Sequence, residues 1–538
     1  MAPGWRLASA LLALAASGAA LARLPDGRLH GNMPRAPAVP PLSADDLVVT
    51  DASGAALPPL NTTYLFDQLI DHTNPKLGTF KQRFWTTWEF YEKGGPIVLF
   101  TPGEVNGAGY TGYLTNRTVN GQIAQQQKGA TIVLEHRFYG NSTPFGNLEV
   151  SSLRFHTIQQ AIDDLEYFAN NVVLPMPGGD AVKPNTQAPW VLVGGSYSGA
   201  LTSWAMVNKP NLFRAGYASS AVVEAILDYW GYFEPIRQFM PKNCSADVEA
   251  VIAHVDKVFT SGTKAEIDAL KANWGMQDLT HLDDVAGSLR NNLWDWQSLS
   301  PDTGSEGQFF QFCDALEVKN GTVAPASGFG LEHALTAWGS YWNSTYLKDV
   351  CGKTDVVDCL GSYNSSQTYY SDTSLGNDGR SWEWIVCTQV GFLQDGPPQN
   401  HPAVVTRLVQ PSYDERQCTY FFPEAFPKPT APNVQFVNEA YKGWNVSIDR
   451  LFFANGQRDP WRESTVSADG ATTRSTNEQP IAVGDGFHCS DLITENGSVD
   501  PTVLAVQQRS LTFMKTWLEG FKPSKPAKRS YSPRRKST

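Results

Sequence analysis

A short apolar segment that runs straight into a glycine-rich turn constrains the fold of this chain more than any other feature. Residues 190–193 (WVLV) are continuously apolar, and the turn that follows reads GGSYSG with Ser196 at its apex. Small residues around a serine let a strand and a helix approach closely, and the tight turn between them exposes the serine hydroxyl. The motif departs from strict G-x-S-x-G spacing only at Ser198, whose small side chain still fits the turn. The segment predicts a strand, a sharp turn and a helix.

Other apolar runs of the same kind are spaced along the chain. They lie at residues 96–100, 131–134 and 451–454. Because these runs lack the alternation of a half-exposed strand, they are typical of parallel strands with helices on both faces. Residues 157–168 place their apolar side chains on one helical face. Strands that alternate with helices predict an α/β fold.

The middle of the chain, residues 225–430, has a different pattern. Thr263 and Glu266 form a capping box, and residues 247–259 and 331–342 have amphipathic helical spacing. Most of the cysteines also lie in this part. We therefore predict a sheet domain made of residues 61–224 and 431–521, split by a mainly helical, disulfide-bearing cap at 225–430. A cap of this kind is typical of an enzyme that covers its site.

The amino terminus has the pattern of a secretory signal. Residues 1–22 contain one charge, Arg6, then an apolar run that closes with small residues. Residues 23–60 are rich in Pro, Ala and Gly, which favours a propeptide or flexible lead-in. No other stretch approaches 18 apolar residues, so we predict no membrane span. The sequence predicts a secreted, extracellular protein.

The cysteines and the glycosylation motifs agree with an oxidising compartment. The seven cysteines include no CxxC pair, which disfavours a zinc or redox site and favours up to three disulfides with one thiol left over. Their pairing is open at this point. Asn-x-Ser/Thr motifs, which mark candidate glycosylation sites and exposed surface, occur at nine positions: Asn61, Asn116, Asn141, Asn243, Asn320, Asn343, Asn364, Asn445 and Asn496.

Charge is distributed unevenly along the chain. The formal net charge is −11, yet residues 522–538 hold seven Lys or Arg and no acid. With three prolines, these residues favour a disordered basic tail. The rest of the chain is correspondingly more acidic, which disfavours nucleic acid as a partner. The sequence gives no oligomeric state and implies no metal or cofactor.

Two further loops supply the partners that a nucleophilic serine needs. A serine hydroxyl requires a general base, and the base requires an orienting acid. Asp459 follows the apolar run 451–454, and His488 lies 29 residues later in a glycine-flanked loop. Serine, acid, histidine is the chain order of α/β-hydrolases. Ser196, Asp459 and His488 are therefore the candidate catalytic triad.

An oxyanion hole requires two backbone N–H donors. One is expected at Tyr197, directly after the nucleophile. The other is expected in the loop after the first apolar run, where Pro102 has no N–H and Gly103 or Glu104 follows. We predict Tyr197 and Gly103 as the donors.

Longer motifs resemble a known family. GGSY at 194–197, NGxxDPW at 455–461 and GFHCSDL at 486–492, with EHRFYG at 135–140 and QLIDH at 68–72, resemble the prolyl carboxypeptidase / dipeptidyl peptidase II family of serine peptidases. Within it, the chain is most like the secreted acid prolyl endoproteases. The resemblance implies an α/β-hydrolase with a helical cap that cleaves proline-containing peptides after proline at acidic pH.

The resemblance also implies roles for single residues. Ser196 matches the nucleophile, Asp459 the acid, His488 the base, and Trp461 an aromatic wall of the proline pocket. Gln389 departs from the family pattern, because relatives often have Glu there. If that Glu binds a charged amino end of the substrate, its absence would weaken exopeptidase activity.

The favoured function is thus an acid-active endopeptidase that cleaves on the carboxyl side of proline. The alternatives are an exopeptidase of the same family (a Pro-Xaa carboxypeptidase or a dipeptidyl peptidase), a lipase or esterase with the same triad, and a non-catalytic binding glycoprotein. A lipase or esterase differs from a peptidase only in its pocket, whereas a binding protein would need the triad positions to be coincidental.

Overall fold

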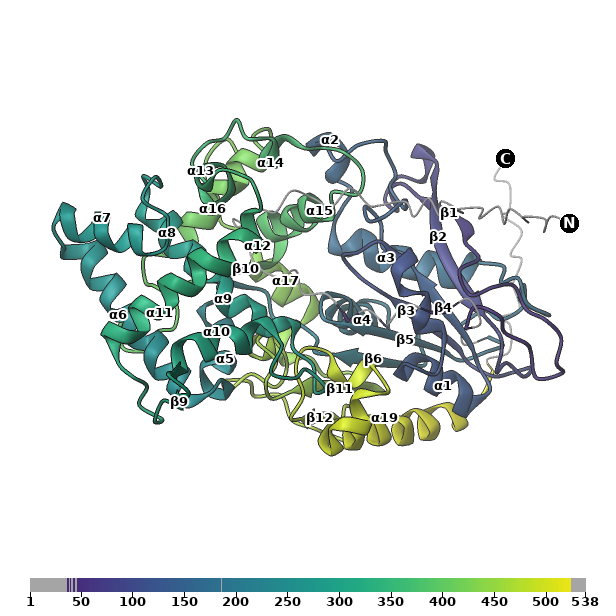
Figure 1. Ribbon diagram of the computed structural model, residues 1–538. Coiled ribbons are helices and arrows are strands. Elements are labelled where there is room, and N and C mark those ends of the chain that lie inside the picture. Colours follow the sequence, from purple (N-terminus) through teal and green to yellow (C-terminus); the bar gives the residue numbers. More distant parts are fainter. Residues whose placement is uncertain (1–35, 38, 40–41, 44–45, 185, 524–538) are drawn as a thin grey trace, which may run out of the picture.

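The computed structural model describes residues 36–37, 39, 42–43, 46–184 and 186–523. The predicted signal and residues 524–538 of the predicted tail lie outside these ranges. Figure 1 shows a sheet covered by helices in one half of the molecule and a group of helices in the other half. Within the described ranges, no helix is long and apolar enough to cross a membrane.

Eight strands of the described chain form one sheet, in the order β1-β2-β4-β3-β5-β6-β11-β12. The strands from β4 to β12 run parallel, whereas β2 pairs antiparallel with β1 and with β4. The carboxyl ends of the parallel strands share one edge, where α/β sheets hold their sites. The strands are β1 (Tyr64–Leu69), β2 (Thr79–Thr87), β3 (Ile97–Thr101), β4 (Ala130–Leu134), β5 (Trp190–Gly195), β6 (Ala215–Ser219), β11 (Leu451–Gly456) and β12 (Ile481–Gly484).

Helices cover both faces of this sheet, which explains its continuously apolar strands. In β5, Trp190 and Leu192 pack on one face, while Val191 and Val193 pack on the other. The first face is covered by α3 (Ile158–Asn171), α4 (Tyr197–Asn208) and α17 (Val434–Tyr441), and the second by α1 (Val119–Gln127) and α19 (Pro501–Glu519). The structure is the α/β-hydrolase fold that the sequence predicts.

A mainly helical insertion separates β6 from β11 (Figure 1). Its strand β7 (Ile226–Asp228) pairs in parallel with β10 (Gly391–Leu393), so segments more than 160 residues apart meet. The capping box predicted at Thr263 and Glu266 is present at the start of α7. The helices of the insertion are α5 (Phe233–Phe239), α6 (Lys242–Ser261), α7 (Lys264–Asn273), α8 (Leu282–Leu289), α9 (Asn291–Trp294), α10 (Gln308–Glu317), α11 (Leu331–Tyr341), α12 (Leu347–Cys351), α13 (Val356–Leu360), α14 (Thr368–Ser371), α15 (Asp378–Ile385) and α16 (Pro411–Phe421).

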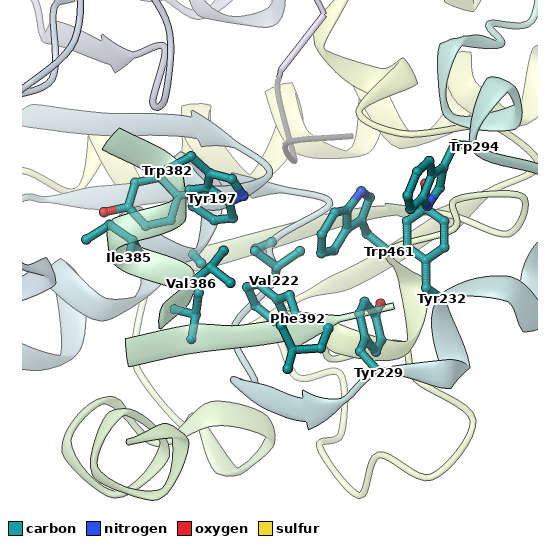
Figure 2. Close-up of a cluster of buried hydrophobic side chains, with 14 of the residues drawn as sticks. Tyr197, Val222, Tyr229, Tyr232, Trp294, Trp382, Ile385, Val386, Phe392 and Trp461 are labelled. Carbon is teal, nitrogen blue, oxygen red and sulfur yellow. The ribbon is translucent and has the colours of Figure 1, made fainter. Parts of the chain in front are cut away.

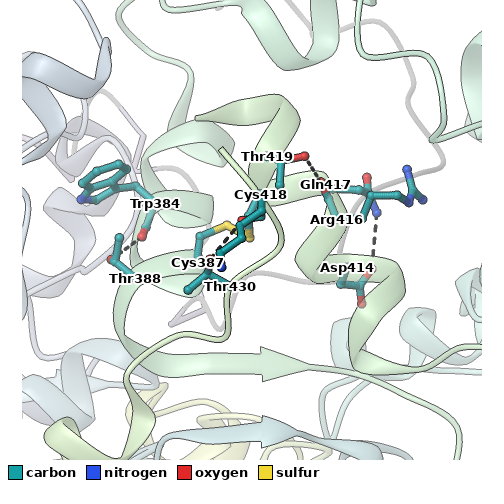
Figure 3. Close-up of a disulfide and its surroundings, with 10 residues drawn as sticks. Trp384, Cys387, Thr388, Asp414, Arg416, Gln417, Cys418, Thr419 and Thr430 are labelled. Atoms are coloured by element: carbon teal, nitrogen blue, oxygen red, sulfur yellow. Dashed lines mark hydrogen bonds between the residues drawn. A yellow bond between two sulfur atoms is a disulfide. The ribbon is translucent and has the colours of Figure 1, made fainter. Parts of the chain in front are cut away.

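Three disulfides cross-link this insertion. They join Cys244 to Cys313, Cys351 to Cys359 and Cys387 to Cys418. Figure 3 shows the last of these, which ties the π-helical turn Val386–Val390 to α16. All seven cysteines lie in the described ranges, and Cys489 stays a buried thiol. The predicted three disulfides and single free thiol are confirmed.

Part of the predicted lead-in, residues 23–60, packs on the sheet domain, whereas most of residues 48–59 are exposed. Ala36 and Leu60 are buried, and the backbone oxygens of Ala36 and Pro37 accept hydrogen bonds from the hydroxyls of Tyr110 (2.9 Å) and Tyr113 (2.6 Å). Small apolar side chains of this segment fit beside the 3-10 helix Gly107–Leu114. Its Pro- and Ala-rich composition, which suggested flexibility, does not reveal these contacts.

Candidate active site

The turn at Ser196 has the strained geometry that its glycines predict. Ser196 joins β5 to α4 with φ +62° and ψ −125°, a conformation that non-glycine residues rarely adopt. A Cβ on Gly194 would lie 2.0 Å from the backbone oxygen of Ser198, and one on Gly195 would lie 2.6 Å from Leu492. The N–H of Ser196 donates to the Ser219 oxygen in the neighbouring strand β6 (2.8 Å). Only glycine fits the two positions before the serine.

The structure brings the three candidate triad residues together. His488 Nδ1 lies 2.8 Å from Asp459 Oδ1, and His488 Nε2 lies 2.7 Å from Ser196 Oγ. A carboxylate can only accept a hydrogen bond, so Nδ1 carries the proton and Nε2 is free to accept the serine proton. Asp459 and Ser196 are fully buried, and His488 is 6% exposed. This arrangement can activate a serine hydroxyl for attack on a carbonyl carbon.

Burial and the Asp459 carboxylate shift the pKa of His488 in opposite directions. Removal from water lowers the pKa of its imidazole, but the Asp459 carboxylate raises it and prevails, so the pKa lies well above its usual value. Asp459 Oδ1 is itself fixed, because it also accepts the N–H of Trp461 (2.8 Å). The acid therefore both orients the ring and stabilises its charged form.

The two expected oxyanion donors lie beside the nucleophile. Tyr197 is the first residue of α4, where backbone N–H groups have no acceptor within the helix. Gly103, in the loop after β3, has φ +80°, and a Cβ there would contact the Ser198 side chain at 3.4 Å. The loop after β3 thus packs on the first turn of α4. Both N–H groups remain proposals as oxyanion donors.

Trp461 belongs to an aromatic cluster that includes Tyr229 and Phe392 (Figure 2). Its ring centroid lies 5.6 Å from that of Tyr229, 5.4 Å from that of Phe392 and 6.4 Å from that of His488. Its Nε1 donates to Gln297 Oε1 (2.5 Å), and the side chain is 1% exposed. Tyr229 and Phe392 come from the insertion, so the cap completes the surroundings of the triad.

A cavity of about 10 Å³, no larger than one water molecule, adjoins this cluster. One wall, Trp382, packs against Tyr197 at 5.5 Å, and another, Trp461, packs against His488. The sequence did not indicate the walls that come from the cap, because isolated aromatic residues in a helical segment resemble core positions. The cavity is lined by Arg290, Trp294, Trp382, Val386, Phe392, Leu393, Gln394 and Trp461.

Gln389, the position that departs from the family pattern, lies at the junction of cap and sheet domain. Its Oε1 accepts the N–H of Ile158 in the first turn of α3 (3.1 Å). The side chain therefore caps a helix.

The glycosylation candidates differ in exposure. Asn496 is only 7% exposed, and its Nδ2 donates to the backbone oxygen of Ser490 (2.9 Å). Because the folded chain buries this side chain, Asn496 is the least favourable of the nine candidates. Asn243 is half-buried, and the exposed candidates are Asn61, Asn116, Asn141, Asn320, Asn343, Asn364 and Asn445.

Known proteins resemble this chain over most of its length. It is 34% identical to "Serine protease vicPa" of Bipolaris victoriae, over 87% of this chain and 91% of that protein. It is 31% identical to "Probable extracellular serine carboxypeptidase" of Arthroderma benhamiae, over 83% of this chain and 65% of that protein. It is 26% identical to "Lysosomal Pro-X carboxypeptidase" of Pongo abelii, over 85% of this chain and 88% of that protein.

Among solved structures, an acetylester hydrolase from Corynebacterium glutamicum matches 84% of this chain and 95% of its own, with 11% identity and a TM-score of 0.35. The family model described as "Serine carboxypeptidase S28" matches residues 68–510. This match spans both halves of the sheet, the insertion and all three triad positions. The chain therefore belongs to the S28 family of serine peptidases.

Proposed function

We propose that this protein hydrolyses peptide bonds on the carboxyl side of proline, with Ser196 as nucleophile. His488 Nε2 takes the serine proton as Oγ attacks the prolyl carbonyl, and Asp459 stabilises the imidazolium that forms. The N–H groups of Tyr197 and Gly103 receive the developing oxyanion. His488 then protonates the leaving amine, and water releases the acyl-enzyme. The 2.8 Å and 2.7 Å contacts of His488 support these roles.

The observation that carries the proline specificity is the aromatic cluster around Trp461. A proline ring has no polar handle, so its binding gains come from packing against apolar and aromatic faces. Trp461 is two residues from Asp459 and packs on His488, so a ring bound against it lies beside the reacting carbonyl. The relative named as a Pro-X carboxypeptidase supports the same specificity.

We favour internal cleavage over removal of terminal residues, because the sequence motifs are most like those of the secreted acid prolyl endoproteases. A dipeptidyl peptidase must bind a positively charged amino end, for which a carboxylate is the natural partner. Gln389 carries no charge and its Oε1 accepts the N–H of Ile158, so such a partner would have to come from another residue. The relatives named as carboxypeptidases favour the alternative, a Pro-Xaa carboxypeptidase.

The acid activity that the resemblance implies has a definite requirement. His488 acts as base only when its ring is neutral, and Asp459 raises its pKa. As pH falls through that raised pKa, the free enzyme loses its base, so this contact argues against an acid optimum. Activity in acid would require bound substrate to lower the pKa of the ring. The pH profile of kcat/KM reports the pKa in the free enzyme and that of kcat reports it in the substrate complex, so the two profiles together test this requirement.

Secretion and glycosylation form part of the proposal. The three disulfides and the exposed asparagine motifs support an oxidising, extracellular compartment. The relative named as extracellular supports it as well. Mass spectrometry of the protein from the culture medium gives its amino terminus and its glycans.

The function is tested with a fluorophosphonate and with blocked peptides. The probe is expected to label the wild-type protein and not Ser196→Ala, and a protein that resists the probe would not be a serine hydrolase. A long peptide blocked at both ends, with proline or alanine at the cleavage position, is then digested. Internal cuts after proline alone support the proposal. Cleavage that requires a free end assigns an exopeptidase, and turnover of acyl esters without peptides assigns an esterase.

A further inference from the structure

Three buried hydrogen bonds fasten the loop that carries His488 to the end of β6. The N–H of Cys489 donates to Ser220 Oγ (3.0 Å). Two residues further on, the Asp491 carboxylate accepts the Ser219 hydroxyl at Oδ1 (2.8 Å) and the Tyr217 hydroxyl at Oδ2 (2.7 Å). Both carboxylate oxygens of Asp491 are therefore bound to one strand.

The same strand end holds the other two catalytic segments. The Ser219 oxygen accepts the N–H of Ser196, and the N–H of Ser220 donates to the Ala454 oxygen (2.7 Å) in β11, which leads to Asp459. The end of β6 is thus the common anchor of the nucleophile, the acid loop and the histidine loop. The nucleophile and the acid segment are attached by backbone hydrogen bonds. The histidine loop is attached through the side chains of Tyr217, Ser219 and Ser220.

Asp491 has the properties of a structural anchor. It is 5% exposed, and its backbone oxygen accepts Gln507 Nε2 of α19 (3.1 Å). Burial raises the pKa of its carboxyl, while the hydroxyls of Tyr217 and Ser219 lower it. Four titratable groups interact electrostatically with the Asp491 carboxyl: Asp459, Cys489, Tyr113 and Tyr217.

The loop that Asp491 holds is conformationally demanding. Cys489 has φ +55° and Ser220 has φ +42°, both in the left-handed region that disfavours side chains with a Cβ. Such conformations persist only where surrounding contacts fix them. His488 immediately precedes Cys489, and its Nε2 must stay 2.7 Å from Ser196 Oγ. A shift of 1 Å at such a contact is enough to lower a rate about 100-fold.

We propose that Asp491 is a positioning residue, which holds the His488 loop in register with Ser196 through Tyr217, Ser219 and Ser220. The inference rests on the triad of the proposed function but not on its proline specificity. Asp491 contacts no reacting atom, so its effect passes through His488.

The test is Asp491→Asn, read by the rate at which a fluorophosphonate labels Ser196. An amide nitrogen cannot accept a hydrogen bond, so one of the two hydroxyls loses its acceptor and can only accept from the amide instead. The remaining bonds are no longer charge-assisted, which weakens the attachment of the loop to β6. We expect the labelling rate and kcat to fall about 10- to 100-fold while KM changes less than twofold. Tyr217→Phe removes one of the two bonds and is expected to give a smaller loss of the same kind.

The insertion offers a control. Asp284 is also buried and accepts the hydroxyls of Ser362 and Tyr413, both at Oδ1, while its Oδ2 accepts the N–H of Ser362 (3.1 Å). Asp284→Asn is expected to lower the melting temperature as Asp491→Asn does, without slowing labelling of the folded protein. If Asp491→Asn does not fold, Tyr217→Phe is compared with Tyr413→Phe.

Two outcomes would overturn the inference: wild-type labelling rates in folded Asp491→Asn, or equal slowing in the two aspartate variants. A wild-type protein that the probe does not label would instead refute the proposed function, so the two failures are distinct.

Discussion

The most informative single change is Asp459→Asn, which removes a charge but keeps the shape of the site. In the wild-type protein Asp459 Oδ1 accepts both His488 Nδ1 and the N–H of Trp461. Because Oδ1 accepts both bonds, the amide oxygen of the asparagine can occupy the place of Oδ1 and accept both. The amide nitrogen then occupies the place of Oδ2, an atom that has no hydrogen-bond partner among the described residues. The imidazole then keeps its tautomer and loses the adjacent negative charge.

The magnitude follows from that geometry. Two unit charges about 4 Å apart attract by about 4 kcal/mol at an effective dielectric constant of about 20. A hydrogen bond to a charged group contributes about 1.5–3 kcal/mol, which sets the lower bound. A loss of about 1.5–4 kcal/mol in the transition state lowers kcat by roughly 10- to 1,000-fold. The same loss lowers the pKa of His488, because the Asp459 carboxylate is what raises it.

The assay is a pH profile of kcat/KM with a fluorogenic prolyl peptide. Asp459 raises the pKa of His488, so its removal leaves the ring neutral at lower pH. We expect the acidic limb to move to lower pH while the plateau falls. Asp485→Asn, a change at a half-exposed residue that pairs with Arg458, is the control and is expected to alter kcat less than twofold. An unmoved limb, or a kcat within fivefold of wild type, would refute this account of Asp459.

Three further changes test the turn, the pocket and the cap. Gly194→Ala puts a Cβ 2.0 Å from the Ser198 oxygen and is expected to abolish activity, whereas Gly146→Ala, with open space around it, should leave activity unchanged. Trp461→Ala should lower the ratio of kcat/KM for prolyl over alanyl peptides about tenfold, and an unchanged ratio would remove Trp461 from the pocket. Replacing both Cys387 and Cys418 by serine opens a 31-residue loop and should lower the free energy of unfolding, measured in guanidinium, by about 3.5 kcal/mol. Replacing both Cys351 and Cys359 opens an 8-residue loop and should lower it by only about 2.5 kcal/mol.

The sheet was predictable wherever a buried strand is continuously apolar. The runs that become β3, β4, β5 and β11 are recognisable because helices cover both of their faces. By contrast, β6 (Ala215–Ser219) consists of small and polar residues, and nothing in its own sequence indicates a central strand. Its place is set by its neighbours, since it pairs with β5 and β11. Its small residues leave room for the nucleophile turn.

The three candidate triad positions were accessible from the sequence for a related reason. Ser196 and Asp459 follow strands that are visible as apolar runs, and chain order together with a glycine-flanked loop then selects His488 among the histidines. The pocket is different, because Tyr229 and Phe392 are 163 residues apart and meet only through the pairing of β7 with β10. No local pattern encodes such a contact. The walls that come from the cap therefore required the structure, whereas Trp461 was accessible because it lies beside the acid.

Gln389 illustrates how a contact changes what a family difference means. From the sequence, a Glu at this position in relatives suggested a partner for the charged amino end of a substrate. In the structure the side chain accepts the N–H of Ile158, at the positive end of the α3 dipole. A carboxylate at that point would be favoured by about 0.3–1 kcal/mol whatever the substrate, because helix amino termini attract negative charge. A Glu there therefore has a structural explanation of its own, and replacing it by Gln does not by itself separate an endopeptidase from an exopeptidase. The discrimination must come from residues that line the path of the substrate, and blocked peptides test it without reference to this position.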